Sequence, residues 1–216
     1  MNEKLRINSI FESISGEAGA IPQGTWCTFI RLQGCNLKCN WCDTPLGQPD
    51  KNEGVEMSLD QIIRTCNNKH IIITGGEPLL QTNVYALFDI LTDLDYVVQV
   101  ETNGSFNVDV DLEKYNKVHF VFDLKCPSSG MFGFMDYKIF LKAKYIKFVI
   151  ADELDLNFAL YRMKYLNRKD AKYIISPLNA DGNKILSIQK IIQKEAPELF
   201  DNIIFSIQIH KIFNLL

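Results

Sequence analysis

Short apolar runs rich in β-branched and aromatic residues alternate along this chain with longer amphipathic segments. Two such runs come first, at residues 5–14 and 25–32, and a segment that contains glycine and proline, 16–24, separates them. Runs of this composition between turn-forming segments are typical of β-strands. The pattern therefore predicts two strands joined by a loop near the N-terminus.

From residue 58 onward the pattern changes to helix followed by strand. Ser58 and Gln61 have the spacing of a capping box, which predicts a helix that continues to about Cys66. The other expected helices are 81–94, 153–166 and 184–194. The other expected strands are 70–74, 96–101, 118–124, 145–150, 172–176 and 203–209. Alternating strands and helices predict right-handed crossovers and a mostly parallel sheet of the α/β class, with its working loops at the carboxyl ends of the strands.

Composition and charge narrow the class of protein. The 216 residues are 47% hydrophobic and 23% charged, which argues against disordered, collagenous and coiled-coil chains. No repeat or linker divides the chain, so we expect a single domain over residues 1–216. The formal net charge of −3 gives no basic surface for nucleic acid. Because no apolar run approaches the roughly 20 residues of a membrane span, we expect a cytoplasmic protein without a membrane partner.

Cysteines supply the strongest chemical signal. Six are present, and without a secretion signal we expect reduced thiols and no disulfide framework. Cys35, Cys39 and Cys42 follow an apolar run at spacings of four and three residues. Three thiolates are one fewer than a closed zinc site or a four-thiolate cluster needs, so either a remote ligand completes the site or one coordination position is open. The remote-ligand alternative is a zinc knuckle completed by Cys27, Cys66, Asp43 or a histidine.

A second motif, Thr74-Gly75-Gly76-Glu77-Pro78, follows the apolar run 71–73. Paired glycines allow a ligand to approach the backbone closely and the carboxylate could accept an amine, although the same segment by itself fits a plain turn. Together with the cysteines it resembles the radical S-adenosylmethionine (SAM) superfamily. In that superfamily three cysteines hold a [4Fe-4S] cluster, SAM binds the fourth iron, and the Gly-Gly-Glu segment binds the SAM amino group. The resemblance implies a modified, incomplete (β/α) barrel, since a full eight-unit barrel takes about 250 residues.

Further segments are similar to the 7-carboxy-7-deazaguanine synthases of queuosine biosynthesis. These segments are 11–17, 29–37, 41–44, 74–81, 101–105, 147–150 and 208–211. The resemblance implies an enzyme, a lyase that converts 6-carboxy-5,6,7,8-tetrahydropterin into 7-carboxy-7-deazaguanine with release of ammonia. It also implies that the reduced cluster passes an electron to SAM, that the resulting radical takes hydrogen from C6 of the pterin, and that SAM is regenerated. A flavodoxin or ferredoxin as reductant and a homodimer are implied as well.

Carried over by position, the resemblance assigns roles to individual residues. The cluster ligands are Cys35, Cys39 and Cys42, and the Mg²⁺ ligand is Thr44. The SAM site consists of Trp41, Cys42, Asp43, Gly76, Glu77, Asp123, Leu124, Lys125 and Ser176. The pterin contacts are Ile14, Ser15, Gly16, Arg31, Thr74 and, through the chain-terminal carboxylate, Leu216. A planar guanidinium suits pairing with a carboxylate, and a hydroxyl is a hard ligand of the kind that Mg²⁺ prefers.

The sequence departs from the family at a few positions. Residues 123–127 read Asp-Leu-Lys-Cys-Pro where Ser-Pro-Lys is frequent, Ala18 replaces a common glycine, and the chain ends on Leu216 where proline is frequent. Two other functions fit part of the pattern. A glycyl-radical activating enzyme shares the cysteine spacing but acts on a protein, and a non-catalytic zinc-binding module would use the thiols alone. Segment 11–17 and the tail at 208–211 favour the pterin enzyme.

Overall fold

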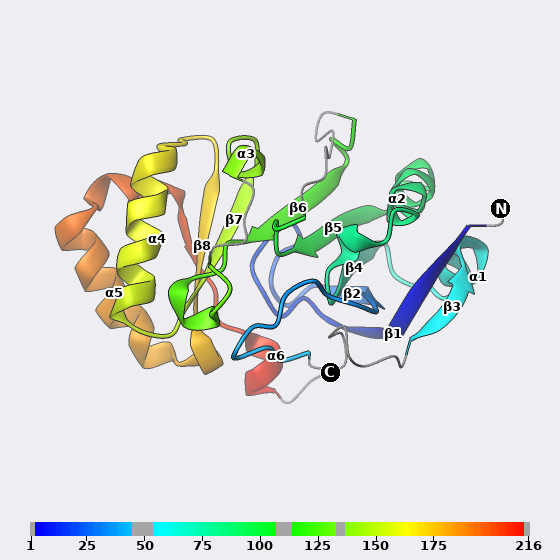
Figure 1. Cartoon of the computed structure of the whole chain (residues 1–216), viewed down its shortest axis with the longest axis horizontal. Coiled ribbons are helices and arrows are strands. Elements are labelled where there is room, and N and C mark those ends of the chain that lie inside the picture. Colours follow the sequence, from blue (N-terminus) through cyan, green and yellow to red (C-terminus); the bar gives the residue numbers. More distant parts are fainter. Residues whose placement is uncertain (1–2, 45–53, 107–113, 133–136, 214–216) are drawn as a thin grey trace.

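The computed structural model describes residues 3–44, 54–106, 114–132 and 137–213, and these contain one continuous nine-stranded sheet. Its strands are β1 (Lys4–Ile14), β2 (Trp26–Leu32), β3 (Val55–Ser58), β4 (His70–Gly75), β5 (Val97–Thr102), β6 (Val118–Asp123), β7 (Tyr145–Ile150), β8 (Lys172–Pro177) and β9 (Ile203–Phe205). The order is β3-β1-β2-β4-β5-β6-β7-β8-β9. β1 runs antiparallel to both neighbours, and pairing from β2 through β9 is parallel. The expected α/β class with a mostly parallel, incomplete barrel is confirmed (Figure 1).

The helices are α1 (Leu59–Arg64), α2 (Val84–Asp93), α3 (Tyr137–Phe140), α4 (Glu153–Leu166), α5 (Gly182–Glu195) and α6 (Ile209–Ile212). The first five contribute side chains to the hydrophobic core on the outer face of the sheet. Alternate strand residues such as Ile71 and Phe148 share one hydrophobic core with Phe88 of α2 and Leu156 of α4. This alternation follows from the two-residue period of a strand, and it leaves the intervening residues to the inner face. Within the described residues, no helix has both the length and the apolar character that crossing a membrane requires.

The segment 16–24 packs against the inner face of the sheet, which curves around it (Figure 1). Ile21 packs there with Ile72, and its backbone N–H donates to Oε1 of Gln99 at 3.0 Å. Gly19 lies so close to the same side chain that a Cβ would come within 2.3 Å of Gln99 Oε1. The interior is therefore filled at this level, and a pocket lies toward the carboxyl ends of the strands.

The last expected strand, 203–209, is wrong beyond Phe205. The Oγ of Ser206 accepts from Ala18 N at 3.0 Å, and the N–H of Ile209 donates to Gly16 O at 3.1 Å. These bonds to the segment 16–24 turn the chain away from the sheet, and α6 begins at Ile209. Strand β3 and helices α3 and α6 were not expected, because each has only four residues, too few to display a period.

Candidate active site

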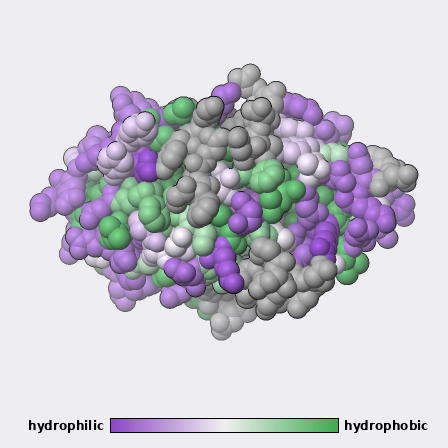
Figure 2. All heavy atoms as spheres, viewed as in Figure 1, coloured by the Kyte–Doolittle hydropathy of each residue, from purple (hydrophilic) through white to green (hydrophobic). Residues whose placement is uncertain are grey.

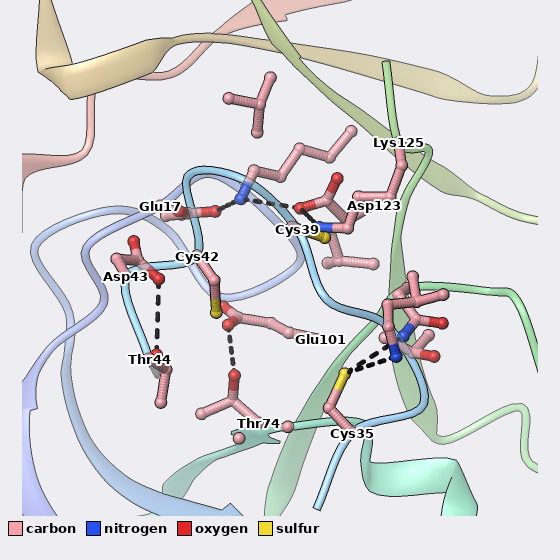
Figure 3. Close-up of a pocket in the computed structure, with 18 of the residues that line it drawn as sticks. Glu17, Cys35, Cys39, Cys42, Asp43, Thr44, Thr74, Glu101, Asp123 and Lys125 are labelled. Carbon is pink, nitrogen blue, oxygen red and sulfur yellow. Dashed lines mark hydrogen bonds and ion pairs between the residues drawn. The ribbon is translucent and has the colours of Figure 1, made fainter. Parts of the chain in front are cut away.

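A pocket of about 940 Å³, including its open mouth, lies at the carboxyl ends of the parallel strands. Four consecutive parallel strands each contribute an inward-facing polar residue to its lining: Thr74, Glu101 and Asp123, which Figure 3 labels, and Lys147. Asp123 lies opposite Lys147 on the neighbouring strand, whereas Glu101 lies opposite Val121, two residues before Asp123. Parallel strands that end together present such side chains at one edge, which is where ligands bind in open α/β sheets.

The three clustered cysteines line the same pocket on the loop that follows β2 (Figure 3). A turn after β6, Pro127–Ser129, holds this loop in place. Asn40 N donates to Ser129 O at 3.0 Å, and Trp41 Nε1 donates to Ser128 Oγ at 3.0 Å. In the described parts of the chain no three Cys, His, Asp or Glu side chains are arranged around a point that would hold a single metal ion. The three thiols nevertheless line one cavity.

Burial makes these thiols harder to ionise. It raises the pKa of Cys35, and it raises the pKa of Cys39 to about 11. The Lys125 ammonium acts in the opposite direction on the pKa of both thiols. Lys125 also lies 5.3 Å from the centre of the Trp41 ring, so it is fixed beside the cysteine loop. The chain therefore supplies a cation close to the thiolates that a metal centre would use as ligands.

The Gly75-Gly76-Glu77 segment forms the opposite wall. Gly75 has a φ of 132°, and Gly76 N donates to Leu32 O at 3.1 Å. Glu77 is fully buried, and its carboxylate accepts from Thr102 Oγ1 at 2.7 Å, Asn103 N at 2.7 Å and Leu79 N at 3.0 Å. Its side chain does not line the pocket. The carboxylate ties the end of β4 to the end of β5.

An ion-pair network of Glu17, Asp123, Lys125 and Lys147 lines the pocket, and Figure 3 labels the first three of these residues. Lys147 bonds to Glu17 and lies 3.6 Å from Asp123, which pairs with Lys125 at 3.0 Å. Gln208 Nε2 donates to Glu17 Oε1 at 2.8 Å. Burial would raise the pKa of the Asp123 carboxyl, but the two lysines outweigh it and hold that pKa below its usual value. The network places fixed charges of both signs against any bound molecule.

Glu101 differs from the carboxylates of this network because no ion pair joins it to a cation among the described residues. Its Oε2 accepts from Thr74 Oγ1 at 2.9 Å. Burial, followed by repulsion from Glu17, raises the pKa of Glu101 to about 7, although Lys147 and Thr74 act to lower it. The carboxyl therefore changes protonation near neutral pH.

Replacing Glu101 by glutamine is expected to raise the free energy of unfolding at pH 8 by about 2 kcal/mol. The folded protein holds a proton on Glu101 up to about pH 7, whereas the unfolded chain releases it near 4.5, so folding stability falls as pH rises between these values. Urea denaturation of Glu101→Gln and the wild type from pH 5 to pH 8 measures the difference. Glu56→Gln, at an exposed surface pair, is the control and should show no such effect. Parallel pH profiles for Glu101→Gln and the wild type would contradict the prediction.

Ten of the residues expected to act at the site line this pocket. They are Cys35, Cys39, Cys42, Trp41, Asp43, Thr44, Thr74, Gly76, Asp123 and Lys125. Others lie outside its lining, namely Ile14, Ser15, Gly16, Arg31, Glu77, Leu124 and Ser176. Leu216 lies outside the described residues.

Two residues outside the lining keep unused hydrogen-bonding groups. Arg31 stacks over Phe11 at 5.0 Å, and its buried Nε has no partner among the described residues. The same holds for the buried Oγ of Ser176.

Six polar residues of the pocket were not assigned a role from sequence: Glu17, Glu101, Thr102, Asn103, Lys147 and Gln208. All six belong to segments that resemble the family, and the period of a strand was a signal that would have selected two of them. Counting alternate residues back from the end of each parallel strand selects Glu101 and Lys147 as inward-facing. Glu17 and Gln208 have no such signal, because a loop and the C-terminal segment bring them together.

Comparisons with known proteins agree with this geometry. Residues 29–129 match the Radical SAM superfamily. The 7-carboxy-7-deazaguanine synthase of Clostridium acetobutylicum is 34% identical over 94% of this chain and 92% of its own length. The enzyme of the same name from Aquifex aeolicus is 32% identical over 98% of this chain and 94% of its own. In fold, the chain is similar to the crystal structure of QueE from Escherichia coli, with a TM-score of 0.71 and 20% identity over 94% of each chain.

These relatives extend over nearly the whole chain and include both walls of the pocket. Membership of the radical SAM superfamily implies a [4Fe-4S] cluster and SAM, and it excludes the zinc-binding module. The relatives from these two organisms have the same name, and each is more than 30% identical to this chain. The chain therefore belongs to the 7-carboxy-7-deazaguanine synthase family of the radical SAM superfamily.

Proposed function

We propose that this chain converts 6-carboxy-5,6,7,8-tetrahydropterin into 7-carboxy-7-deazaguanine with release of ammonia, as a radical SAM enzyme. One observation carries the proposal: the three cysteines and the ring of polar side chains from β4 to β7 line the same pocket. A reactive cofactor and a polar heterocycle would thus meet in one cavity. The named relatives support the same reaction.

Cys35, Cys39 and Cys42 would hold the cluster. The donor set fits, because three thiols on one loop leave one iron open, and Lys125 beside them offsets the cost of ionising buried thiols. When bound and reduced, the cluster and SAM supply the radical that abstracts hydrogen from the substrate. The part of the chain is to hold these groups and the pterin in one geometry and to exclude water.

We place SAM between the cysteine loop and the carboxyl ends of β4, β6 and β8. Backbone groups of Gly76 and the side chains of Trp41, Asp43, Asp123 and Lys125 line that part of the pocket. Glu77, Leu124 and Ser176 are assigned supporting positions, because their side chains lie outside the lining. For Glu77 the support is direct, since its carboxylate orders the wall that Gly76 belongs to.

The pterin would bind against the ion-pair network. Its pyrimidine edge carries N–H donors, which pair with carboxylate and amide oxygens. Glu101 and Glu17 supply carboxylates in the pocket. Gln208 supplies a buried Oε1 that has no partner among the described residues, and its Nε2 is already bonded to Glu17, which fixes the orientation of the amide. Arg31 carries a spare Nε for the substrate carboxylate.

We also propose that the pterin contacts segment 14–16, Thr74 and the terminal carboxylate of Leu216. Thr74 Oγ1 donates to Glu101 and would orient that carboxylate toward the heterocycle. Gly16 O accepts from Ile209 N, which joins this segment to the C-terminal one. The proposed Mg²⁺ ligand, Thr44, lies at the pocket rim with its Oγ1 3.4 Å from Asp43 Oδ1, so two oxygen donors are adjacent there.

The test is an anaerobic assay with a reconstituted cluster, SAM, a strong reductant and the carboxylated tetrahydropterin. Mass spectrometry should detect 7-carboxy-7-deazaguanine with the wild type and none with Cys39→Ala. Omitting Mg²⁺ and adding a chelator tests the Mg²⁺ site, and reduced flavodoxin or ferredoxin in place of the chemical reductant tests the electron donor. Iron and SAM cleavage without the deazaguanine would contradict the substrate. The glycyl-radical activating function would then be tested by adding a glycyl-radical enzyme.

The proposal also includes the domain organisation and the oligomeric state of the protein. A single domain over 1–216 is supported by the one continuous sheet in the described residues. A homodimer is supported by apolar side chains exposed along α4, and Figure 2 shows hydrophobic residues at the surface on the side of α4 and α5. The exposed large hydrophobic residues of α4 are Leu154, Tyr161 and Tyr165. Analytical ultracentrifugation of the purified chain measures its mass in solution, and a monomer at micromolar concentration would reject the dimer.

A further inference from the structure

The side chain of Asn103, which follows β5, points at the sulfur of Cys35. Its Nδ2 lies 3.9 Å from Cys35 Sγ, and the backbone N–H of Leu37 donates to the same sulfur at 3.4 Å. Asn103 is 7% exposed, so water competes little for these contacts. Cys35 therefore receives one donor from its own loop and one from the segment that follows β5.

The orientation of the Asn103 amide is fixed by its neighbours. Its Oδ1 accepts from Ser105 N at 2.9 Å and from Ser105 Oγ at 2.6 Å. With the oxygen bonded on that side, the NH₂ group faces Cys35 and also donates to Asn36 Oδ1 at 3.2 Å. Asn36 Nδ2 in turn donates to Ser105 Oγ at 2.7 Å. The donor toward the sulfur is thus set by a closed set of hydrogen bonds.

The backbone of Asn103 is held as firmly as its side chain. Its N–H donates to Oε2 of the buried Glu77 at 2.7 Å. The Glu77 carboxylate is a buried negative charge close enough to Cys35 to interact with it electrostatically. A negative charge near a cluster ligand disfavours adding an electron, whereas an N–H directed at a ligand sulfur favours it. Asn103 therefore contacts both the Cys35 sulfur and the Glu77 carboxylate, whose negative charge opposes reduction of the cluster.

We propose that Asn103 is a positioning residue that raises the reduction potential of the [4Fe-4S] cluster by donating a hydrogen bond to the Cys35 thiolate. The step concerned is the gain of one electron by the oxidised cluster from a one-electron reductant of the flavodoxin or ferredoxin class, and no bond is made or broken. The reduced cluster carries one more negative charge, so the N–H stabilises it more than the oxidised form. The inference rests on the proposed function, in which Cys35 is a cluster ligand.

The experiment compares reconstituted wild type, Asn103→Leu and Asn36→Ala by anaerobic redox titration monitored by electron paramagnetic resonance. Asn103→Leu keeps the size of the side chain and removes the donor to sulfur, and its midpoint potential should be more negative than that of the wild type. Asn36→Ala breaks the same set of inter-loop hydrogen bonds but keeps the Asn103 donor, so its potential should match the wild type. SAM cleavage by Asn103→Leu should slow with a weak reductant and recover with a strong one.

The outcomes separate the inference from the proposed function. A wild type that shows no [4Fe-4S] signal would reject the proposed function. A wild type with a normal cluster and an unchanged potential in Asn103→Leu would overturn the inference alone. If Asn103→Leu fails to retain a cluster, Asn103→Asp and Asn36→Asp are compared, since both add a carboxylate and only the first removes the donor. Equal potentials in that pair would overturn the inference, and a more negative potential in Asn103→Asp would support it.

Discussion

Lys147→Met is expected to destabilise the folded protein by about 3–5 kcal/mol at pH 8, because it leaves buried carboxylates without their shared cation. Lys147 is 8% exposed, bonds to Glu17 and lies 3.6 Å from Asp123. It also acts to lower the pKa of Glu101. Without it, three carboxylates face one remaining lysine, Lys125. The free energy of unfolding from urea denaturation measures the loss.

The loss should depend on pH and on the partner. Protonation of the carboxylates relieves their repulsion, so the destabilisation should be smaller at pH 5 than at pH 8. Adding Glu17→Gln to Lys147→Met should recover part of the stability, because one unpaired charge is removed. Lys142→Met, at an exposed position nearby, should change stability by less than about 0.5 kcal/mol. Equal losses for Lys142→Met and Lys147→Met would show that the network contributes nothing specific.

Gly75→Ala should destabilise the protein by about 4 kcal/mol or more, since backbone conformation and contact both exclude a side chain there. The φ of Gly75 is 132°, and a Cβ would come within 2.3 Å of Leu32 O and 2.4 Å of Leu32 N. Relief requires β2 and β4 to separate, although they pair at this very residue. Chemical denaturation of the variant gives the change in free energy.

Substitutions at Gly34 and Gly182 distinguish the two causes of the loss at Gly75, which are the backbone conformation and the steric contact. Gly34 has a φ of 95° but open space around a Cβ, so Gly34→Ala should cost only the conformational term, roughly 1–2 kcal/mol. Gly182 begins α5, and the nearest atom to its Cβ would be 4.0 Å away, so Gly182→Ala should be neutral or stabilising. If Gly75→Ala costs no more than Gly34→Ala, the close approach of β2 and β4 is not limiting.

The fold was predictable where its elements are long enough to show a period. Strands such as β7 and helices such as α4 carry uninterrupted patterns, and they lie where the pattern predicts them. Helix α2 was expected from residue 81 but begins at Val84, because the Gln81 side chain bonds instead to Arg6 and Gln33. These hydrogen bonds join residues that are 48 or more positions apart in the sequence, so the local sequence pattern could not predict them.

The sequence by itself determined the class of fold, the cysteine loop and the family, because strand and helix periods and closely spaced motifs are local properties of the chain. Only the tertiary structure decided which polar residues share the pocket. Gln208 donates a hydrogen bond to Glu17, which is 191 positions away in the sequence. The Glu77 side chain lies outside the pocket lining because its carboxylate accepts hydrogen bonds from Thr102 and Asn103. Such contacts depend on the register of paired strands and on how the segment 16–24 packs against the sheet. Those are fixed by the whole fold, since a buried charge or amide adopts the position in which its hydrogen bonds are satisfied.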